Sequence, residues 1–292
     1  MTIVERIRRY KYLPFDEGSL RIITDGTIKF TPPSKVNDPF DCASDVETCN
    51  IAEYLNSRPD LLAGPGEMLN LSPAQIIEEK QTMIKRLEIA VDHGAFGQQA
   101  SDSVGICSLM RDPLNLLMWA HYAQHHTGFV VEFDIPVEVT DTDKPPTDRL
   151  LLDWLIPQEV EYQTSKPIVS FFDDKDVKKK KQFLVKGEDW AYEQEERVID
   201  YIRGHGIHKY DRKTVLHSVI AGMKMDDRSY MTLVEPVNKT NQELNLRIGV
   251  YKTEPVKGKF ELFVSGRTDL KPIKSPIGIG TPEQPTRLQS SW

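Results

Sequence analysis

The chain has 292 residues, of which 39% are hydrophobic and 28% are charged, and this composition is typical of a globular protein and not of a disordered one. A formal charge of −7 argues against a general binder of nucleic acids or membrane surfaces, although a local basic groove is compatible with it. The cysteines form no C-x-x-C pair, and neither a signal peptide nor an apolar run of about 18 residues is found. We therefore expect a soluble, cytoplasmic protein without a zinc site of that type and without membrane contact.

The first third of the chain is expected to combine short strands with a helical insertion. Residues 1–14 lead into an extended segment, residues 16–26 form a short helix, and residues 27–31 alternate like a strand. The segment 32–42 holds three prolines and is expected to be a loop. Residues 50–100 are mostly helical by the spacing of their apolar side chains.

The remainder alternates strands with two further helices. A short helix is expected around 115–118 and a charged helix over 173–191. Strands are expected at 104–110, 128–134, 159–164, 195–202, 217–223, 245–254 and 259–264, and the last two are expected to pair.

These elements predict an α+β fold with a mixed or antiparallel central sheet and a helical insertion. Residues 1–269 are expected to form a single domain, because no linker-like composition interrupts them. Residues 270–292 are rich in proline, serine and glycine and are expected to form a tail.

Three islands of sequence carry a family resemblance. They lie at 10–42, 106–134 and 190–199, and they contain the motifs "NDPFD", "MWAHY…GF" and "WAYEQEERVI". In this order they resemble a large, mainly bacterial family called domain of unknown function 2971. The order of motifs is also similar to that of the ADP-ribosyltransferase superfamily. Within that superfamily, the chain most resembles the toxins that modify nucleic acids. This second resemblance implies an ADP-ribosyltransferase-like fold and an enzyme that consumes NAD.

The resemblance implies a catalytic carboxylate in the late acidic motif. Transfer of ADP-ribose passes through an oxocarbenium-like transition state, which a carboxylate near the ribose stabilises. Glu195 is the first candidate and Glu193 its rival, and the two share a face if the segment is extended. Trp190, Tyr192 and Arg197 flank them as candidate ligands of a ring and of a phosphate or ribose. The alternative is a solvated strand edge with an ordinary Glu–Arg pair.

Two earlier motifs are further candidates for nucleotide binding. Tyr10 and Tyr12 share one side of the first strand and Lys11 points to the other, so either side could face the nucleotide. Packing of the two rings at the rim of the strand is the alternative. Asn37 and Asp38 could bind a ribose, although capping their own loop is the commoner use of Asn-Asp-Pro.

A cluster of rings precedes the central strand at 128–134. Trp119 and Tyr122 could form the wall of a site for a flat ring, and His121 could bond a ribose hydroxyl or a phosphate. The alternative is a Trp119 packed in the core and a His121 bonded to a backbone carbonyl. A metal site at His121 and the following histidines is not expected, because the motif lacks the glutamate of H-E-x-x-H.

Three functions remain open from the sequence. The first is an NAD-consuming ADP-ribosyltransferase-like enzyme, a toxin or phage-defence effector that modifies nucleic acid or protein. The second is a non-catalytic sensor or adaptor domain that binds a nucleotide or a phage protein. The third is a metal-dependent hydrolase or nuclease built on Glu193, Glu195 and Asp134.

The basic run 177–183 is a solvated helix face or, alternatively, a contact to phosphates of a nucleic-acid acceptor.

Overall fold

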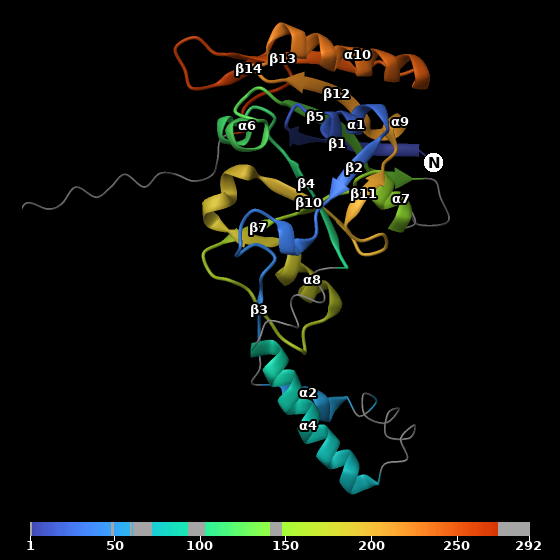
Figure 1. The fold of residues 1–292 in the computed structure, drawn as a ribbon, viewed down its shortest axis with the longest axis vertical. Coiled ribbons are helices and arrows are strands. Elements are labelled where there is room, and N and C mark those ends of the chain that lie inside the picture. Colours follow the sequence, from blue (N-terminus) through green and yellow to red (C-terminus); the bar gives the residue numbers. More distant parts are fainter. Residues whose placement is uncertain are drawn as a thin grey trace, which may run out of the picture.

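The two longest strands, β1 (Thr2–Leu13) and β5 (Phe129–Thr140), pair in the middle of a mixed sheet in the computed structural model (Figure 1). The structure describes residues 2–47, 50–58, 60, 72–92, 103–140 and 148–273. In these residues the sheet has eight strands in the order β14-β13-β12-β5-β1-β4-β10-β6. The other strands of this sheet are β4 (Gly105–Met110), β6 (Gln158–Glu159), β10 (Glu195–Asp200), β12 (Leu216–Ala221), β13 (Gly249–Pro255) and β14 (Leu262–Val264). The expected α+β fold with a mixed central sheet is confirmed.

Antiparallel pairing dominates this sheet. Among the described strands, the parallel neighbours in the sheet are β12 and β13, which α10 (Asp227–Leu244) connects. The late strands β13 and β14 pair, as expected from the sequence, and their pairing is antiparallel. Three two-stranded sheets complete the pairing: β2 (Thr27–Phe30) with β11 (Gly206–Lys209), β3 (Asp45–Val46) with β8 (Ile168–Val169), and β7 (Glu161–Gln163) with β9 (Val185–Gly187).

The described helices surround the sheet or extend from it. They are α1 (Glu17–Thr24), α2 (Ile51–Ser57), α4 (Pro73–Asp92), α6 (Leu116–Tyr122), α7 (Asp148–Asp153), α8 (Lys175–Phe183), α9 (Arg212–Val215) and α10, with 3-10 turns η1 (Pro33–Lys35) and η2 (Glu188–Glu193). In Figure 1, α2 and α4 lie together at the end of the molecule away from the sheet, where the helical insertion was expected. None of the described helices combines the length and apolar composition needed to cross a bilayer.

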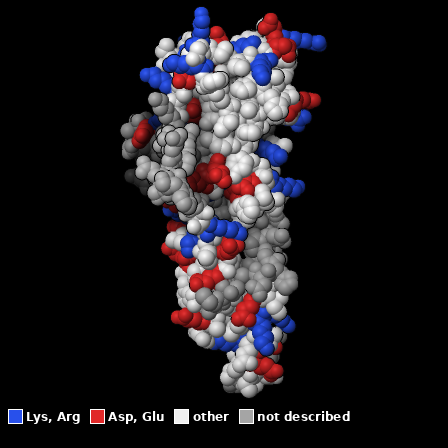
Figure 2. All heavy atoms as spheres, turned by 90° about the vertical axis from the view of Figure 1, so that its left-hand side faces the viewer, with Lys and Arg blue, Asp and Glu red and all other residues white. Residues whose placement is uncertain are grey.

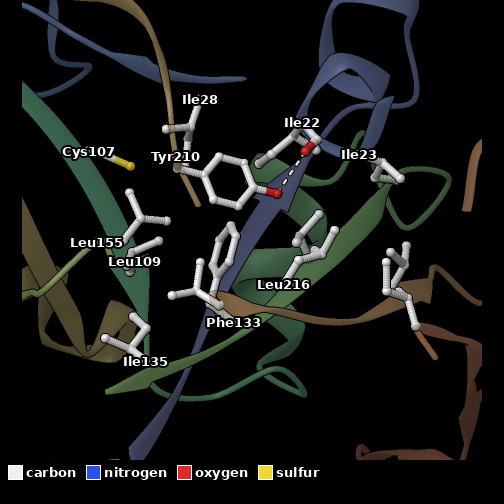
Figure 3. Packing of buried hydrophobic residues seen from close by; sticks show 14 of the residues in the cluster. Ile22, Ile23, Ile28, Cys107, Leu109, Phe133, Ile135, Leu155, Tyr210 and Leu216 are labelled. Carbon is white, nitrogen blue, oxygen red and sulfur yellow. Dashed lines mark hydrogen bonds between the residues drawn. The ribbon is translucent and has the colours of Figure 1, made fainter. Parts of the chain in front are cut away.

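The main hydrophobic core lies between the sheet and helices α1 and α10. Figure 3 shows Ile22 and Ile23 of α1 facing Phe133 of β5 and Leu216 of β12. The hydroxyl of Tyr210 donates to the carbonyl oxygen of Ile22 at 2.7 Å, so the buried ring keeps a polar partner. This packing fixes the sheet on which the candidate site is built.

One expected boundary is wrong. The charged helix expected over 173–191 ends at Phe183, because β9 then pairs with β7 and η2 follows. The tail expected at 270–292 lies outside the described residues from residue 274 onward.

Candidate functional site

A pocket of about 230 Å³ lies where the end of β4 meets the start of β10. We call it the carboxylate pocket. Loop residues 31–41, α6 and β9 complete its walls. Its lining includes Lys11, Tyr12, Lys35, Asn37, Asp41, Ser108, Tyr122, Lys186, Glu193, Glu195 and Arg197. Figure 2 shows the side of the molecule that lies to the left in Figure 1, where acidic atoms gather near mid-height between basic ones.

The late acidic motif reaches this pocket through a turn. Glu193 ends η2, Gln194 takes a left-handed conformation with φ 47°, and Glu195 begins β10. The sequence analysis considered an extended segment here, but the segment is extended only from Glu195 onward. The turn nevertheless brings both carboxylates to the ammonium of Lys186, which lies 2.5 Å from Glu193 and 3.1 Å from Glu195.

The floor of the pocket is a buried ionic cluster. Arg197 binds Glu195 through Nε at 2.8 Å and Asp41 through Nη2 at 2.5 Å. Asp41, Lys186, Glu193, Glu195 and Arg197 are all at least nine-tenths buried. With every group ionised, these three carboxylates and two cations leave one negative charge uncompensated within the cluster.

The two glutamates of this cluster are held differently. Burial alone would raise the pKa of Glu195, but Arg197 and Lys186 outweigh it and lower that pKa to about 2. Burial raises the pKa of Glu193 above its usual value, and Lys186 and Tyr122 only partly oppose this while Glu195 adds to it. Both oxygens of Glu193 are bonded, one to Tyr122 and the other to Lys186, yet its pKa is raised whereas that of Glu195 is lowered.

Tyr122 brings the ring cluster to the acidic pair. Its hydroxyl donates to Glu193 Oε1 at 2.6 Å and accepts from Asn37 Nδ2 at 2.8 Å. Asn115 begins α6 by accepting two backbone N–H groups and donates to the carbonyl oxygen of Tyr192 at 2.7 Å. This bond ties α6 to η2 and so holds Tyr122 beside Glu193.

The first strand also contributes to the pocket. Lys11 donates to the carbonyl oxygen of Ser108 at 3.0 Å, and both residues line the pocket. Tyr12 lines it with its ring, while its hydroxyl donates to the carbonyl oxygen of Asp112 at 2.6 Å. Tyr10 lies elsewhere: it is buried and its hydroxyl donates to Glu132.

Other candidates do not reach the carboxylate pocket. Trp119 is fully buried and donates from Nε1 to the carbonyl oxygen of Pro113 at 2.8 Å, so it belongs to the core. His121 is exposed and its ring packs edge-on against Tyr122. Asp38 accepts the N–H of Phe40 and so caps its own loop. Trp190 lies over the Lys186 ammonium at 4.9 Å and packs against Tyr192, on the outer side of the cluster.

Of the three carboxylates of the hydrolase hypothesis, Asp134 does not join the two glutamates of the pocket. Asp134 pairs with Arg6 at 2.6 Å and Arg8 at 2.9 Å, and not with the glutamates of the pocket. Within the described residues no group of three or more histidine, cysteine, aspartate or glutamate side chains could hold a metal ion. In the basic run, Lys180 and Lys181 pair with Glu161 and Asp173, which agrees with a solvated helix face.

Sequence reasoning missed Lys186, Asp41 and Asn115. Lys186 fell in an expected charged helix, where a lysine carries no signal. Asp41 ends the motif "NDPFD" in the loop, and its position in this motif could have marked it as a candidate site residue.

The fold and the pocket define an α+β protein whose central sheet carries a buried cluster of three carboxylates and two cations at the edge of a small pocket. Residues 118–198 match the model of the family described as "Protein of unknown function (DUF2971)", which supports the family resemblance seen in the sequence. The matched segment contains Tyr122, Lys186, Glu193, Glu195 and Arg197. Neither the curated proteins nor the solved structures contain a match to the chain.

Proposed function

We propose that the protein is a cytoplasmic NAD-consuming enzyme of the ADP-ribosyltransferase type, and that the carboxylate pocket binds the nicotinamide-ribose end of NAD. The observation that carries the proposal is that Glu193 lines this pocket beside Tyr122, where burial and Glu195 raise its pKa despite the Lys186 ammonium at 2.5 Å. Such a carboxylate gains more than one with a lowered pKa from a positive charge that develops nearby.

The reaction supplies a charge of that sign. The bond between the nicotinamide nitrogen and C1′ of the ribose breaks, the electron pair leaves with nicotinamide, and an oxocarbenium-like centre forms at C1′. The ionised Glu193 stabilises this centre electrostatically, in a pocket whose walls are largely buried. Tyr122 and Asn37 hold the carboxylate in place, and a nucleophilic acceptor completes the transfer by bonding to C1′ and losing its proton.

Glu195 serves as a positioning residue in this proposal. Both of its oxygens are bonded, Oε1 to Arg197 Nε at 2.8 Å and Oε2 to Arg197 Nη2 at 3.0 Å and Lys186 at 3.1 Å. It therefore fixes Lys186, which in turn holds Glu193. Glu193 replaces Glu195 as the first candidate for the reacting carboxylate.

Nicotinamide release from NAD by the purified protein tests the proposal. We expect release with the wild-type protein in the presence of an acceptor, offered separately as DNA, RNA and protein. Glu193→Gln should lower the rate at least about 100-fold, the usual effect of removing one preorganised electrostatic contact. Glu188→Gln is the matched control, because Glu188 is exposed in the same 3-10 turn.

Three outcomes would contradict the proposal or its assignment. Stabilisation of the fold by NAD without nicotinamide release would identify a binding module in place of an enzyme. Loss of release in Glu195→Gln, with full release in Glu193→Gln, would make Glu195 the reacting group. If bacteria that express the wild-type protein grow as well as bacteria that express Glu193→Gln, the protein is not a toxin to its host.

A further inference from the structure

A second pocket, of about 240 Å³, adjoins the carboxylate pocket. Lys186 lines both pockets. The proline-rich loop also faces both: Asn37 and Asp41 line the carboxylate pocket, while Asp38 and Phe40 line the second one. This loop and Lys186 therefore form a common wall between two pockets of nearly equal volume.

The volumes argue that neither pocket alone holds a dinucleotide. Sites for small ligands usually enclose about 300–1,000 Å³. The carboxylate pocket, at about 230 Å³, is smaller than this range. A dinucleotide consists of two nucleoside halves joined by a pyrophosphate, so two adjacent pockets of this size match its shape.

The second pocket has the side chains that a nucleoside requires. Phe40 is 76% exposed and lines this pocket, so its ring is accessible to a ligand. Trp190 supplies a second, half-buried aromatic face. Flat aromatic rings stack on nucleobases, and this stacking is a main source of affinity for bases outside a duplex. The carboxylate of Asp38 is an acceptor of the kind that binds ribose hydroxyls.

We propose that the second pocket binds the adenosine half of NAD, with the adenine against Phe40 and Trp190. This inference rests on the proposed function for the choice of dinucleotide. The nicotinamide-ribose half then lies in the carboxylate pocket, and the pyrophosphate crosses the wall at the loop. The exposed Lys35 lines the carboxylate pocket, and the exposed Lys166, which pairs with Asp45 at 2.5 Å, lines the second one; they are the cations that we assign to the pyrophosphate.

Calorimetric binding of the two halves of NAD tests the assignment. AMP and nicotinamide mononucleotide should bind the wild-type protein at the same time, and NAD should displace both. Phe40→Ala should weaken AMP binding about tenfold, as the loss of one stacking contact does, and leave the mononucleotide unaffected. Trp190→Ala should act in the same direction. Phe260→Ala is the control, because Phe260 is 97% exposed and lines neither pocket.

The assignment fails if AMP does not bind, if it competes with nicotinamide mononucleotide, or if Phe40→Ala and Trp190→Ala leave its affinity unchanged. These results are distinct from a failure of the proposed function. If AMP binding depends on Phe40 but no nicotinamide is released, the base pocket is supported and only the glycosyl transfer is rejected. If nicotinamide is released but the affinity for AMP does not depend on Phe40, the glycosyl transfer is supported and the base pocket is rejected.

Discussion

Two buried ionic networks lie on the central sheet, and they differ in how completely their charges are matched. In the buried ionic cluster at the floor of the carboxylate pocket, the two cations Lys186 and Arg197 face three carboxylates. In the second network, Glu132 of β5 accepts two bonds from Arg267, at 2.8 and 2.9 Å, and further bonds from Ser218 and Tyr10. Burial would raise the pKa of Glu132, but Arg267 and Ser218 outweigh it and lower that pKa.

The difference separates a structural role from a functional one. Because Arg267 follows β14 and pairs with Glu132 of β5, this network ties the C-terminal end of the described chain to the middle of the sheet. Arg267 also pairs with Asp269 at 2.8 Å. None of Glu132, Arg267, Ser218 and Tyr10 lines the carboxylate pocket. A satisfied buried network stabilises and specifies a fold, whereas a group left with incomplete compensation beside a pocket marks a candidate site for chemistry.

The largest effect is expected from Arg267→Met. Removal of this arginine leaves Glu132 buried without its main counter-charge, and loss of one partner of a buried pair costs about 3–5 kcal/mol. The free energy of unfolding, measured by urea denaturation, should fall by about that amount. Nicotinamide release per folded molecule should stay unchanged, because Arg267 does not line the carboxylate pocket.

Arg247→Met is the control for this substitution, because Arg247 is exposed and should change the stability by less than about 0.5 kcal/mol. If Arg267→Met and Arg247→Met have the same free energy of unfolding, the second network contributes nothing to the stability of the fold.

The sequence predicted this sheet and its acidic strand well. The alternation in β10 places Glu195 and Arg197 on one face, where they bond, and Glu196 on the other, where Arg9 holds it at 2.6 Å. Tyr122, Lys11, Tyr12 and Asn37 were candidates and do line the pocket. A local period of two is enough to divide the side chains of a strand between two faces.

What the sequence could not reveal depends on contacts between distant segments. Lys186 and Glu193 meet because β9 pairs with β7 and because Gln194 turns the chain, and neither event leaves a local pattern. Trp119 and Tyr122 lie on one short helix, yet only the hydrophobic core decides that one is buried and the other lines a pocket. The helix α10 carries Pro236 in its middle, which is typical of a helix boundary and conceals the element.

A smaller effect is expected from Tyr122→Phe, which sharpens the comparison at the pocket. The hydroxyl of Tyr122 donates to Glu193 at 2.6 Å, and a hydrogen bond to a charged group contributes about 1.5–3 kcal/mol. We expect kcat/KM for nicotinamide release to fall by about tenfold or more. Tyr192→Phe is the matched control, because no hydrogen bond of its hydroxyl is seen in the described residues; an equal loss in both variants would exclude a specific role for Tyr122.

The smallest effect, and the sharpest contrast between the networks, is the pH dependence of stability. The pKa of Glu193 is raised in the folded state, so its favourable contribution is present below the unfolded value near 4.5 and is lost as the pH rises through the folded pKa. Glu193→Gln mimics the protonated form and avoids this loss. Its melting temperature should exceed that of the wild type by roughly 2–4 °C at pH 7, the shift that about 1 kcal/mol produces, and the excess should vanish toward pH 4.

Glu132→Gln should show the opposite sign. The pKa of Glu132 is lowered, so its contribution is present above the unfolded value and is lost as the pH falls. The substitution should therefore lower the melting temperature at pH 7, and the deficit should shrink toward acid pH. Thermal unfolding of both variants and of the wild type from pH 4 to pH 8 measures the two slopes. If Glu193→Gln is destabilised at pH 7 as Glu132→Gln is, Glu193 is a compensated structural carboxylate and the case for its part in catalysis is lost.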